Sequence, residues 1–254
     1  MIGIFDSGTG GLSVFKEIRK LLPEENYVYY SDNAHCPYGE KSREYIIDRA
    51  RFITDFLLDK GADIIIVACN TATAAAISTL RKEYPDTPFI GMEPAIKPAV
   101  KRTRTGVVGV LATAGTLKAD KYLSTREKWA EGVRIAEHIG QGFVELVENG
   151  KTEGEEAEDI VRESLKPILD QGADVIVLGC THYPFLAGTI AKISKELYPE
   201  RDTHIIDPAP AVAKHTLEVM TEKGLLDDTG KVFDMKLYSS GDGTCLNKTY
   251  KTLI

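Results

Sequence analysis

The chain has 254 residues, 43% hydrophobic and 27% charged, so it can bury the core of one large α/β domain or of two small ones. Its formal net charge of −7 argues against a broad nucleic-acid-binding surface, and the basic cluster at 97–104 is interpreted as a solvated linker and helix end. No apolar run reaches the roughly 18 residues that a membrane helix needs. No basic segment precedes the strand-like start of the chain, so we expect no secretory signal, no membrane partner and a cytoplasmic protein.

Short β-branched runs alternate with longer helical patterns along the chain. The first half predicts strands at 2–5, 27–30, 64–68 and 89–91, with helices at 12–22, 43–60 and 73–84. The second half predicts strands at 107–111, 133–137, 175–178 and 204–206, with helices near 115–129, 155–171 and 184–197. The strands at 64–68 and 175–178 are continuously apolar, which is typical of strands buried on both faces of a parallel sheet. The alternation predicts helices on both faces of mostly parallel sheets.

The chain also repeats itself. Segments 57–71 and 168–182 match at a constant offset of 111 residues, and Gly-Ala-Asp precedes a cysteine at the same distance in each. Weaker matches pair 93–95 with 207–209 and 3–7 with 109–113. The repeat predicts two similar, pseudo-twofold-related α/β domains with the active site in the cleft between them. We expect the first to comprise 1–96 plus a returning segment 208–254, and the second to comprise 97–207.

Polar motifs follow four of the predicted strands, at 6–11, 69–71, 113–116 and 180–182. Ligands bind beyond the carboxyl ends of parallel strands, where helix N-termini attract anions. None of the four motifs contains Lys or Arg, so a substrate carboxylate would be held by hydroxyls, amides and main-chain N–H groups. The glycines of 6–11 also suit a plain strand-to-helix turn, and the segment lacks the third glycine and the lysine of nucleotide-binding loops.

Four cysteines, at positions 36, 69, 180 and 245, form no Cys-x-x-Cys pair and have no histidine at zinc-finger spacing, so we expect free thiols and no metal. One cysteine after a buried strand is commonly a core residue. Two at matching positions of a duplicated fold, Cys69 and Cys180, indicate chemistry instead. Inverting a stereocentre needs one group that removes a proton from one face and another that delivers a proton to the opposite face. A thiol suits both tasks because its reference pKa is about 8.5.

Motifs spread over nearly the whole chain carry a resemblance to a known family. They are Phe5-Asp6-Ser7-Gly8 with Gly10-Gly11-Leu12-Ser13-Val14, Pro37-Tyr38-Gly39, Ala68-Cys69-Asn70-Thr71-Ala72, Thr113-Ala114-Gly115-Thr116, Phe143-Val144 with Leu146-Val147-Glu148, and Gly179-Cys180-Thr181-His182-Tyr183-Pro184. In these motifs and their order the chain resembles the glutamate racemases, within the cofactor-independent aspartate/glutamate racemases.

The resemblance implies roles for particular residues. Cys69 and Cys180 match the two catalytic bases, and Asp6, Glu148 and His182 match the groups that assist them. The implied substrate contacts are Ser7, Pro37, Tyr38, Gly39, Asn70, Thr71, Thr113, Thr116 and Thr181. The chain departs from the family at His35, where an arginine is usual, at Glu145, where proline is common, and at 207–210.

The resemblance further implies interconversion of L- and D-glutamate without a metal or cofactor, in a homodimer that supplies D-glutamate for peptidoglycan synthesis. An aspartate racemase or a broader amino-acid racemase of the same family is the alternative, although His182 favours glutamate. An ATPase of the sugar-kinase/actin type would need a second acidic glycine-rich loop where this chain has Ala112-Thr113. A two-domain protein that only binds an amino acid would have no use for paired thiols.

Overall fold

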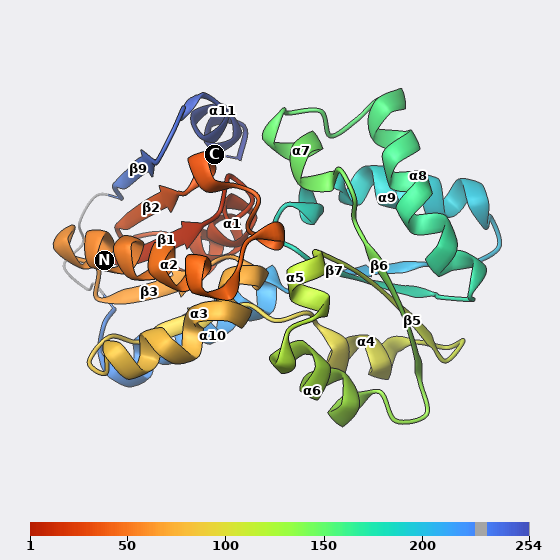
Figure 1. The fold of residues 1–254 in the computed structure, drawn as a ribbon, viewed down its shortest axis with the longest axis horizontal. Helices are drawn as coiled ribbons and strands as arrows, with labels where there is room; N and C mark the ends of the chain where they lie inside the picture. Colours follow the sequence, from red (N-terminus) through yellow and green to blue (C-terminus); the bar gives the residue numbers. More distant parts are fainter. Residues whose placement is uncertain (227–232, 254) are drawn as a thin grey trace. The chain divides into compact units, whose positions relative to one another are not determined.

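The computed structural model describes residues 1–226 and 233–253 (Figure 1). Contacts within the chain divide it into two compact units, Met1–Met92 with Ala209–Ile254 and Glu93–Pro208. Among the described helices, none combines the length and the apolar surface that crossing a lipid bilayer requires.

The first unit is built on a five-stranded parallel sheet with the strand order β4-β3-β1-β2-β9. Its strands are β1 (Ile2–Asp6), β2 (Tyr27–Ser31), β3 (Ile64–Val67), β4 (Phe89–Gly91) and β9 (Met235–Ser239). Strands β1, β2 and β3 are buried along their whole length, as their apolar runs predict. The C-terminal segment joins this sheet through β9, which pairs with β2.

Helices cover both faces of this sheet (Figure 1). On one face α2 (Arg43–Asp59) packs beside α3 (Asn70–Glu83), and their apolar residues form one buried cluster with Phe5, Val28 and Ile65 of the sheet. On the other face α1 (Leu12–Leu21) packs beside α10 (Ala209–Lys223), while α11 (Thr244–Leu253) contacts α1 and β9. The ring of Phe15 in α1 meets that of Tyr27 edge-on at 5.1 Å.

The second unit has a four-stranded parallel sheet with the order β6-β5-β7-β8. The strands are β5 (Val107–Ala112), β6 (Arg134–Ile139), β7 (Val175–Gly179) and β8 (His204–Ile206). Helices α8 (Glu155–Asp170) and α9 (Ala187–Leu197) pack together on one side, and α4 (Ile96–Arg102) packs with α6 (Asp120–Trp129) on the other. The short α5 (Ala114–Leu117) and α7 (Phe143–Glu148) follow β5 and β6.

The two sheets confirm the duplication that the sequence predicts. The order β4-β3-β1-β2 of the first unit matches the order β8-β7-β5-β6 of the second. Gly61 and Gly172, which are 111 residues apart, both adopt the left-handed conformation, with φ of 88° and 99°, directly after the ends of α2 and α8. Residues with a Cβ rarely adopt this φ, so both copies stop the helix with the same residue.

The helix after the last strand of each copy packs in the other unit. Helix α4 follows β4 of the first sheet but contacts β5 and β7 of the second. Helix α10 follows β8 of the second sheet but contacts α1 and β4 of the first. Each unit is therefore completed by a helix that the other half of the duplication supplies.

The predicted strands are confirmed to within two residues at each end, whereas the helices differ more. The helix expected near 115–129 is two helices, α5 and α6, and the one expected at 184–197 opens with a 3₁₀ turn over Tyr183–Leu186. The basic segment interpreted as a linker is mostly α4. Helices α7, α10 and α11 and strand β9 were not predicted as elements.

Asp174 anchors the entry to the second sheet. It lies directly before β7, is buried, and accepts four hydrogen bonds. The donors are the Thr103 hydroxyl (2.5 Å), the Arg104 N–H (2.7 Å), and the hydroxyl (3.0 Å) and N–H (3.2 Å) of Thr105. Burial opposes ionisation of this carboxyl, but the hydrogen bonds outweigh it and lower the pKa of Asp174.

We expect Asp174→Ala to lower the free energy of unfolding by about 2–3 kcal/mol, because it leaves buried donors without an acceptor. The matched control is Asp63→Ala, at the equivalent position of the first unit, where the carboxylate binds the terminal ammonium of Met1 at 2.8 Å and is 56% exposed. That surface pair is worth less than about 1 kcal/mol. Urea unfolding at neutral pH measures both.

The Asp174 contribution also has a defined pH dependence. Because its pKa is lowered in the folded protein, the stabilisation is present above the unfolded value of about 3.9 and is lost as the pH falls through the folded value. The difference between the wild-type protein and Asp174→Ala should therefore shrink below about pH 4. A difference that stays constant from neutral to acidic pH would contradict this assignment.

Candidate active site

The polar motifs predicted from the sequence lie at the carboxyl ends of parallel strands. In the first unit β1 ends at Asp6, and Cys69 follows β3 after one residue. In the second unit Thr113 follows β5 and Cys180 follows β7 directly. Within each unit, parallel pairing brings these ends to one edge of the sheet.

Asp6 holds the turn between β1 and α1. Its side chain is fully buried, and Oδ2 accepts the N–H groups of Gly8 (3.2 Å) and Gly11 (3.0 Å). The Tyr29 hydroxyl donates to the Gly8 carbonyl at 2.9 Å. A Cβ at Gly11 would lie 2.7 Å from the Tyr29 oxygen and 2.8 Å from the Asp6 Cβ. The glycines thus allow a tight turn, and Asp6 fixes the segment that carries Ser7.

Cys69 is the N-cap residue of α3. Its Sγ accepts the N–H of Ala72 at 3.5 Å and lies 3.9 Å from the Ser7 hydroxyl, and only 5% of the residue is exposed. A helix N-terminus with a free N–H group favours negative charge on a sulfur at this position. The location of Cys69 therefore suits a thiol that becomes a thiolate during a reaction.

Asn70 and Thr71 begin α3 and are buried. Among the described residues, neither the amide oxygen nor the amide nitrogen of Asn70 has a hydrogen-bond partner. Buried polar groups are almost always paired, so an unpaired one at a candidate site is a candidate for contact with a ligand. Asn70 is thus available to donate to and accept from a substrate.

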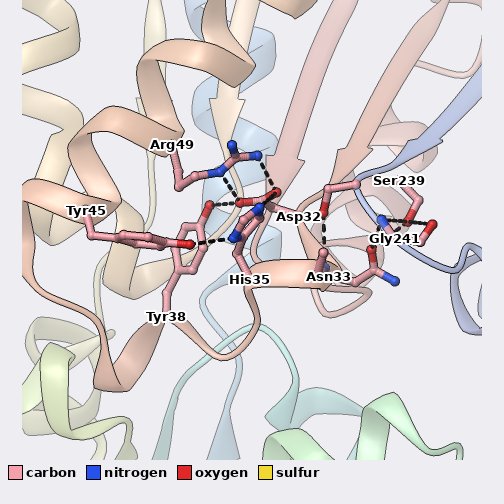
Figure 2. Close-up of polar contacts among 10 residues, drawn as sticks. Asp32, Asn33, His35, Tyr38, Tyr45, Arg49, Ser239 and Gly241 are labelled. Atoms are coloured by element: carbon pink, nitrogen blue, oxygen red, sulfur yellow. Dashed lines mark hydrogen bonds and ion pairs between the residues drawn. The ribbon is translucent and has the colours of Figure 1, made fainter.

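Pro37, Tyr38 and Gly39 lie after β2, where two 3₁₀ turns span Asn33–His35 and Tyr38–Glu40. Tyr38 is buried, and its hydroxyl donates to the carboxylate of Asp32 at 2.5 Å (Figure 2). Burial and the Asp32 charge raise the pKa of Tyr38, so it is a neutral donor. Pro37 and Gly39 are partly exposed on either side of it.

Cys180, His182 and Glu148 form a chain of polar contacts in the second unit. The Cys180 Sγ lies 3.8 Å from Nδ1 of His182, whose Nε2 lies 2.6 Å from Oε1 of Glu148. An ionised carboxylate only accepts hydrogen bonds, so Nε2 carries a hydrogen and Nδ1 faces the thiol. Cys180 and His182 are 8% and 1% exposed, so this proton path is shielded from water.

Three threonines complete the site residues of the second unit. Thr113 is the N-cap of α5, where its Oγ1 accepts the Thr116 N–H at 3.3 Å and lies 3.0 Å from the Thr116 hydroxyl. Thr181, which lies between Cys180 and His182 in the sequence, is also buried. The structure thus gathers Thr113, Thr116, Cys180 and Thr181 at the carboxyl edge of the second sheet.

Two residues of the first unit that lie next to the candidate site were not identified from the sequence. Asp32 directly follows β2, the neighbour of the strand that ends at Asp6. Arg49 of α2 binds the Asp32 carboxylate through two N–H groups, at 2.9 and 2.7 Å. The position of Asp32 just beyond the strand predicted at 27–30 was the signal that could have identified it. Arg49 had no such signal, because a helical arginine is usually solvated.

Comparison with known proteins gives a consistent family assignment. Residues 2–216 match the model of the Asp/Glu/Hydantoin racemase family. Glutamate racemase of Stutzerimonas stutzeri is 47% identical over 241 residues, which cover 95% of this chain and 89% of the relative.

Solved structures agree in fold over the whole chain. Glutamate racemase from Francisella tularensis, in complex with D-glutamate, has a TM-score of 0.84 at 30% identity, covering 99% of this chain and 92% of that one. The Escherichia coli glutamate racemase, in complex with L-glutamate and the activator UDP-MurNAc-ala, has a TM-score of 0.85 at 32% identity, covering 99% and 94%. The chain therefore belongs to the Asp/Glu/Hydantoin racemase family and is an amino-acid racemase, an isomerase.

Proposed function

We propose that this racemase interconverts L- and D-glutamate with Cys69 and Cys180 as its two bases, without a metal or organic cofactor. The observation that carries the proposal is the equivalence of the two thiols. They stand 111 residues apart, just after the corresponding strands β3 and β7 of a duplicated fold, and both are buried. A core role for one cysteine gives no reason for the second at the same place.

In this reaction one sulfur is a thiolate and the other carries a proton. The thiolate removes the α-proton of glutamate and becomes S–H, and the electron pair of the broken C–H bond passes to the α-carbon and its carboxylate. The second thiol then gives its proton to the opposite face and becomes the thiolate. Mutual repulsion disfavours two thiolates together, which keeps one proton on the pair. The roles reverse for the reaction from the other enantiomer.

The contacts of each cysteine supply different assistance. The α3 N-terminus and Ser7 lie beside Cys69. At Cys180 the imidazole of His182 accepts the thiol proton at Nδ1 or returns it, and Glu148 keeps Nε2 protonated and stabilises the imidazolium. Asp6 acts mainly by holding the turn with Ser7, since Oδ2 is engaged by two main-chain N–H groups.

The assignment of glutamate as substrate rests on the related racemases of known structure. How its carboxylates are bound is inferred from the polar motifs at 6–11, 69–71, 113–116 and 180–182, which contain no Lys or Arg. Two solved glutamate racemases hold D-glutamate and L-glutamate. In this chain the proposed contacts are neutral: Ser7, Pro37, Tyr38, Gly39, Asn70, Thr71, Thr113, Thr116 and Thr181. Hydroxyls, an amide and main-chain N–H groups hold the carboxylates and stabilise the α-carboxylate as it gains charge. Aspartate turned over faster than glutamate would favour the alternative within the family.

We further propose that the protein works as a cytoplasmic homodimer and that its D-glutamate enters peptidoglycan synthesis. The E. coli relative is solved with UDP-MurNAc-ala as activator, and muramic acid is a sugar of peptidoglycan. Restored growth of a D-glutamate auxotroph that expresses this chain would test the biological role, and sedimentation would test the dimer.

The two-base reaction predicts a solvent isotope pattern. In D2O with EDTA, D-glutamate formed from L-glutamate should carry α-deuterium, because its proton comes from a solvent-exchanged thiol, while unreacted L-glutamate gains little. Product without α-deuterium would rule the mechanism out. Cys69→Ser and Cys180→Ser should each lower racemisation by at least about 10³-fold. Cys245→Ser, which changes a partly buried thiol near Thr249, should keep wild-type activity.

The unpaired amide of Asn70 predicts a separation of binding from stability. Asn70→Ala should raise KM about 10- to 100-fold, because a hydrogen-bonding group for substrate is lost. It should cost little stability, because no hydrogen bond to a described residue is broken. Thr54→Val is the matched control: its hydroxyl in α2 is also buried without a partner among the described residues, yet KM should not change. Equal KM values for the two variants would remove Asn70 from the binding site.

The Glu148–His182 contact predicts an unequal isotope effect. Glu148→Gln keeps the shape but loses the charge that stabilises the imidazolium, so kcat should fall about 10- to 100-fold. With α-deuterated substrates, the primary isotope effect should grow most in the direction in which Cys180 removes the proton. An isotope effect that grows equally in both directions would show that Glu148 does not act on Cys180.

A further inference from the structure

Asp32 is a fully buried carboxylate at the end of β2 with three side-chain hydrogen bonds (Figure 2). The Arg49 guanidinium donates from Nε to Oδ2 at 2.9 Å and from Nη2 to Oδ1 at 2.7 Å. The Tyr38 hydroxyl donates to Oδ2 at 2.5 Å. Residues from a strand end, a helix and a 3₁₀ turn therefore meet at one carboxylate.

A charge buried in this way needs a close partner, because its hydration is lost. Arg49 meets both carboxylate oxygens in the bidentate geometry that suits guanidinium best, and it stacks on the ring of Phe52 at 4.7 Å. The hydrogen bond to Asp32 raises the pKa of Arg49, so the guanidinium stays charged. The pair is therefore neutral overall while still offering an acceptor to Tyr38.

Tyr38 links this pair to the proposed base of the first unit. Tyr38 and Cys69 belong to the same buried cluster. The 3₁₀ turn over Tyr38–Glu40 also contacts α3, whose N-cap residue is Cys69, so Tyr38 lies in the neighbourhood of the sulfur. Burial raises the pKa of Tyr38 most, and the charge of Asp32 and a charge on Cys69 raise it further. An uncompensated carboxylate on Asp32 would oppose a thiolate at Cys69.

We propose that the Asp32–Arg49 ion pair is a positioning device for the racemase reaction, in which Asp32 anchors Tyr38 beside Cys69 and Arg49 cancels the charge of that anchor. The proposal rests on the function proposed above for Tyr38 and Cys69. Neither Asp32 nor Arg49 contacts the reacting atoms in this scheme. Both act through Tyr38 and through the electrostatic potential at the sulfur.

The main chain next to this anchor is held independently (Figure 2). Asn33 accepts hydrogen bonds from the Ser239 hydroxyl at 2.6 Å and the Gly241 N–H at 3.0 Å, and the Ala34 N–H donates to the Ser240 hydroxyl at 3.1 Å. The segment after β9 therefore fixes the start of the loop. A change at Arg49 should alter the Tyr38 side chain and the local charge while the loop backbone stays in place.

Other titratable groups face the pair but bind it less closely. Nε2 of His35 lies 3.9 Å from Oδ1 of Asp32, and Nδ1 of His35 contacts the Tyr45 hydroxyl at 2.5 Å. Burial raises the pKa of Tyr30 in β2; the charge of Asp32 raises it further, and Arg49 lowers it. None of these contacts replaces the two N–H groups of Arg49, so the compensation of Asp32 depends on that side chain.

The test compares Arg49→Met with the double variant Asp32→Asn/Arg49→Met. Arg49→Met leaves a buried carboxylate uncompensated, and we expect kcat/KM for glutamate to fall about 100-fold, with a rise in KM as well as a fall in kcat. The rise in KM separates this from partial unfolding, which removes active enzyme without changing KM. In the double variant the amide oxygen still accepts from Tyr38 and the charge is gone, so most of the loss should be recovered.

The matched control is a similar trio in the second unit. There Glu137 accepts from the buried Tyr122 hydroxyl at 2.6 Å and from Arg126 at 2.8 Å. Among the described residues, the buried cluster that contains Tyr122 includes no cysteine. Arg126→Met should therefore lower stability and leave kcat and KM unchanged. If Arg49→Met behaves like Arg126→Met, or if the double variant is no better than Arg49→Met, the proposal is wrong.

A second readout does not depend on the substrate. Alkylation of Cys69 by iodoacetamide, followed by mass spectrometry at neutral pH, should be about tenfold slower in Arg49→Met and should recover in the double variant. If the wild-type protein fails to racemise glutamate while the alkylation pattern holds, the proposed substrate is wrong and the ion-pair inference stands. If the wild-type protein racemises glutamate but Arg49→Met leaves the alkylation rate unchanged, the proposed substrate stands and the ion-pair inference is wrong.

Discussion

The candidate site depends on parallel strand pairing, which brings the carboxyl ends of neighbouring strands to one edge of each sheet. In the first unit this edge collects Asp6, Asp32 and Cys69, which lie at or just beyond the ends of three adjacent strands. The strands are buried on both faces, so the groups at their ends are largely shielded from water as well. Electrostatic interactions with a bound substrate are stronger where water is excluded. Each charge that is buried there, however, needs a partner to replace its lost hydration.

The fold meets that need in three ways. Asp6 is held by main-chain N–H groups of its own turn, Asp32 by a guanidinium and a phenol, and Asp174 by hydroxyls and N–H groups. Asp32 is paired with a full opposite charge, that of the Arg49 guanidinium. Asp174 lies at the amino end of its strand, away from the carboxyl edge that carries Cys180, and neutral donors are enough there. In the proposed reaction the nearby Cys69 sulfur becomes a thiolate, and a carboxylate neutralised by a guanidinium adds less to the local negative potential than an unpaired carboxylate would.

Much of the fold and of the site could be predicted because the responsible signals are local or repeated. β-Branched runs located the strands, and the 111-residue repeat singled out Cys69 and Cys180. Other features have no local signal. Arg49 and Asp32 are 17 residues apart on different elements. The exchange of α4 and α10 depends on which sheet a helix packs against, and an amphipathic pattern carries no information about that choice.

The duplicated scaffold supports two thiols with unlike surroundings. Cys69 has a helix N-terminus, Ser7 and a nearby phenol, whereas Cys180 has an imidazole–carboxylate chain. In the proposed reaction this asymmetry costs nothing at equilibrium, because substrate and product are mirror images with equal free energies, and the enzyme cannot change their ratio. The kcat/KM values of the two directions must then be equal whatever assists each sulfur. The unlike surroundings of the two sulfurs are therefore compatible with a reaction that runs equally well from either enantiomer.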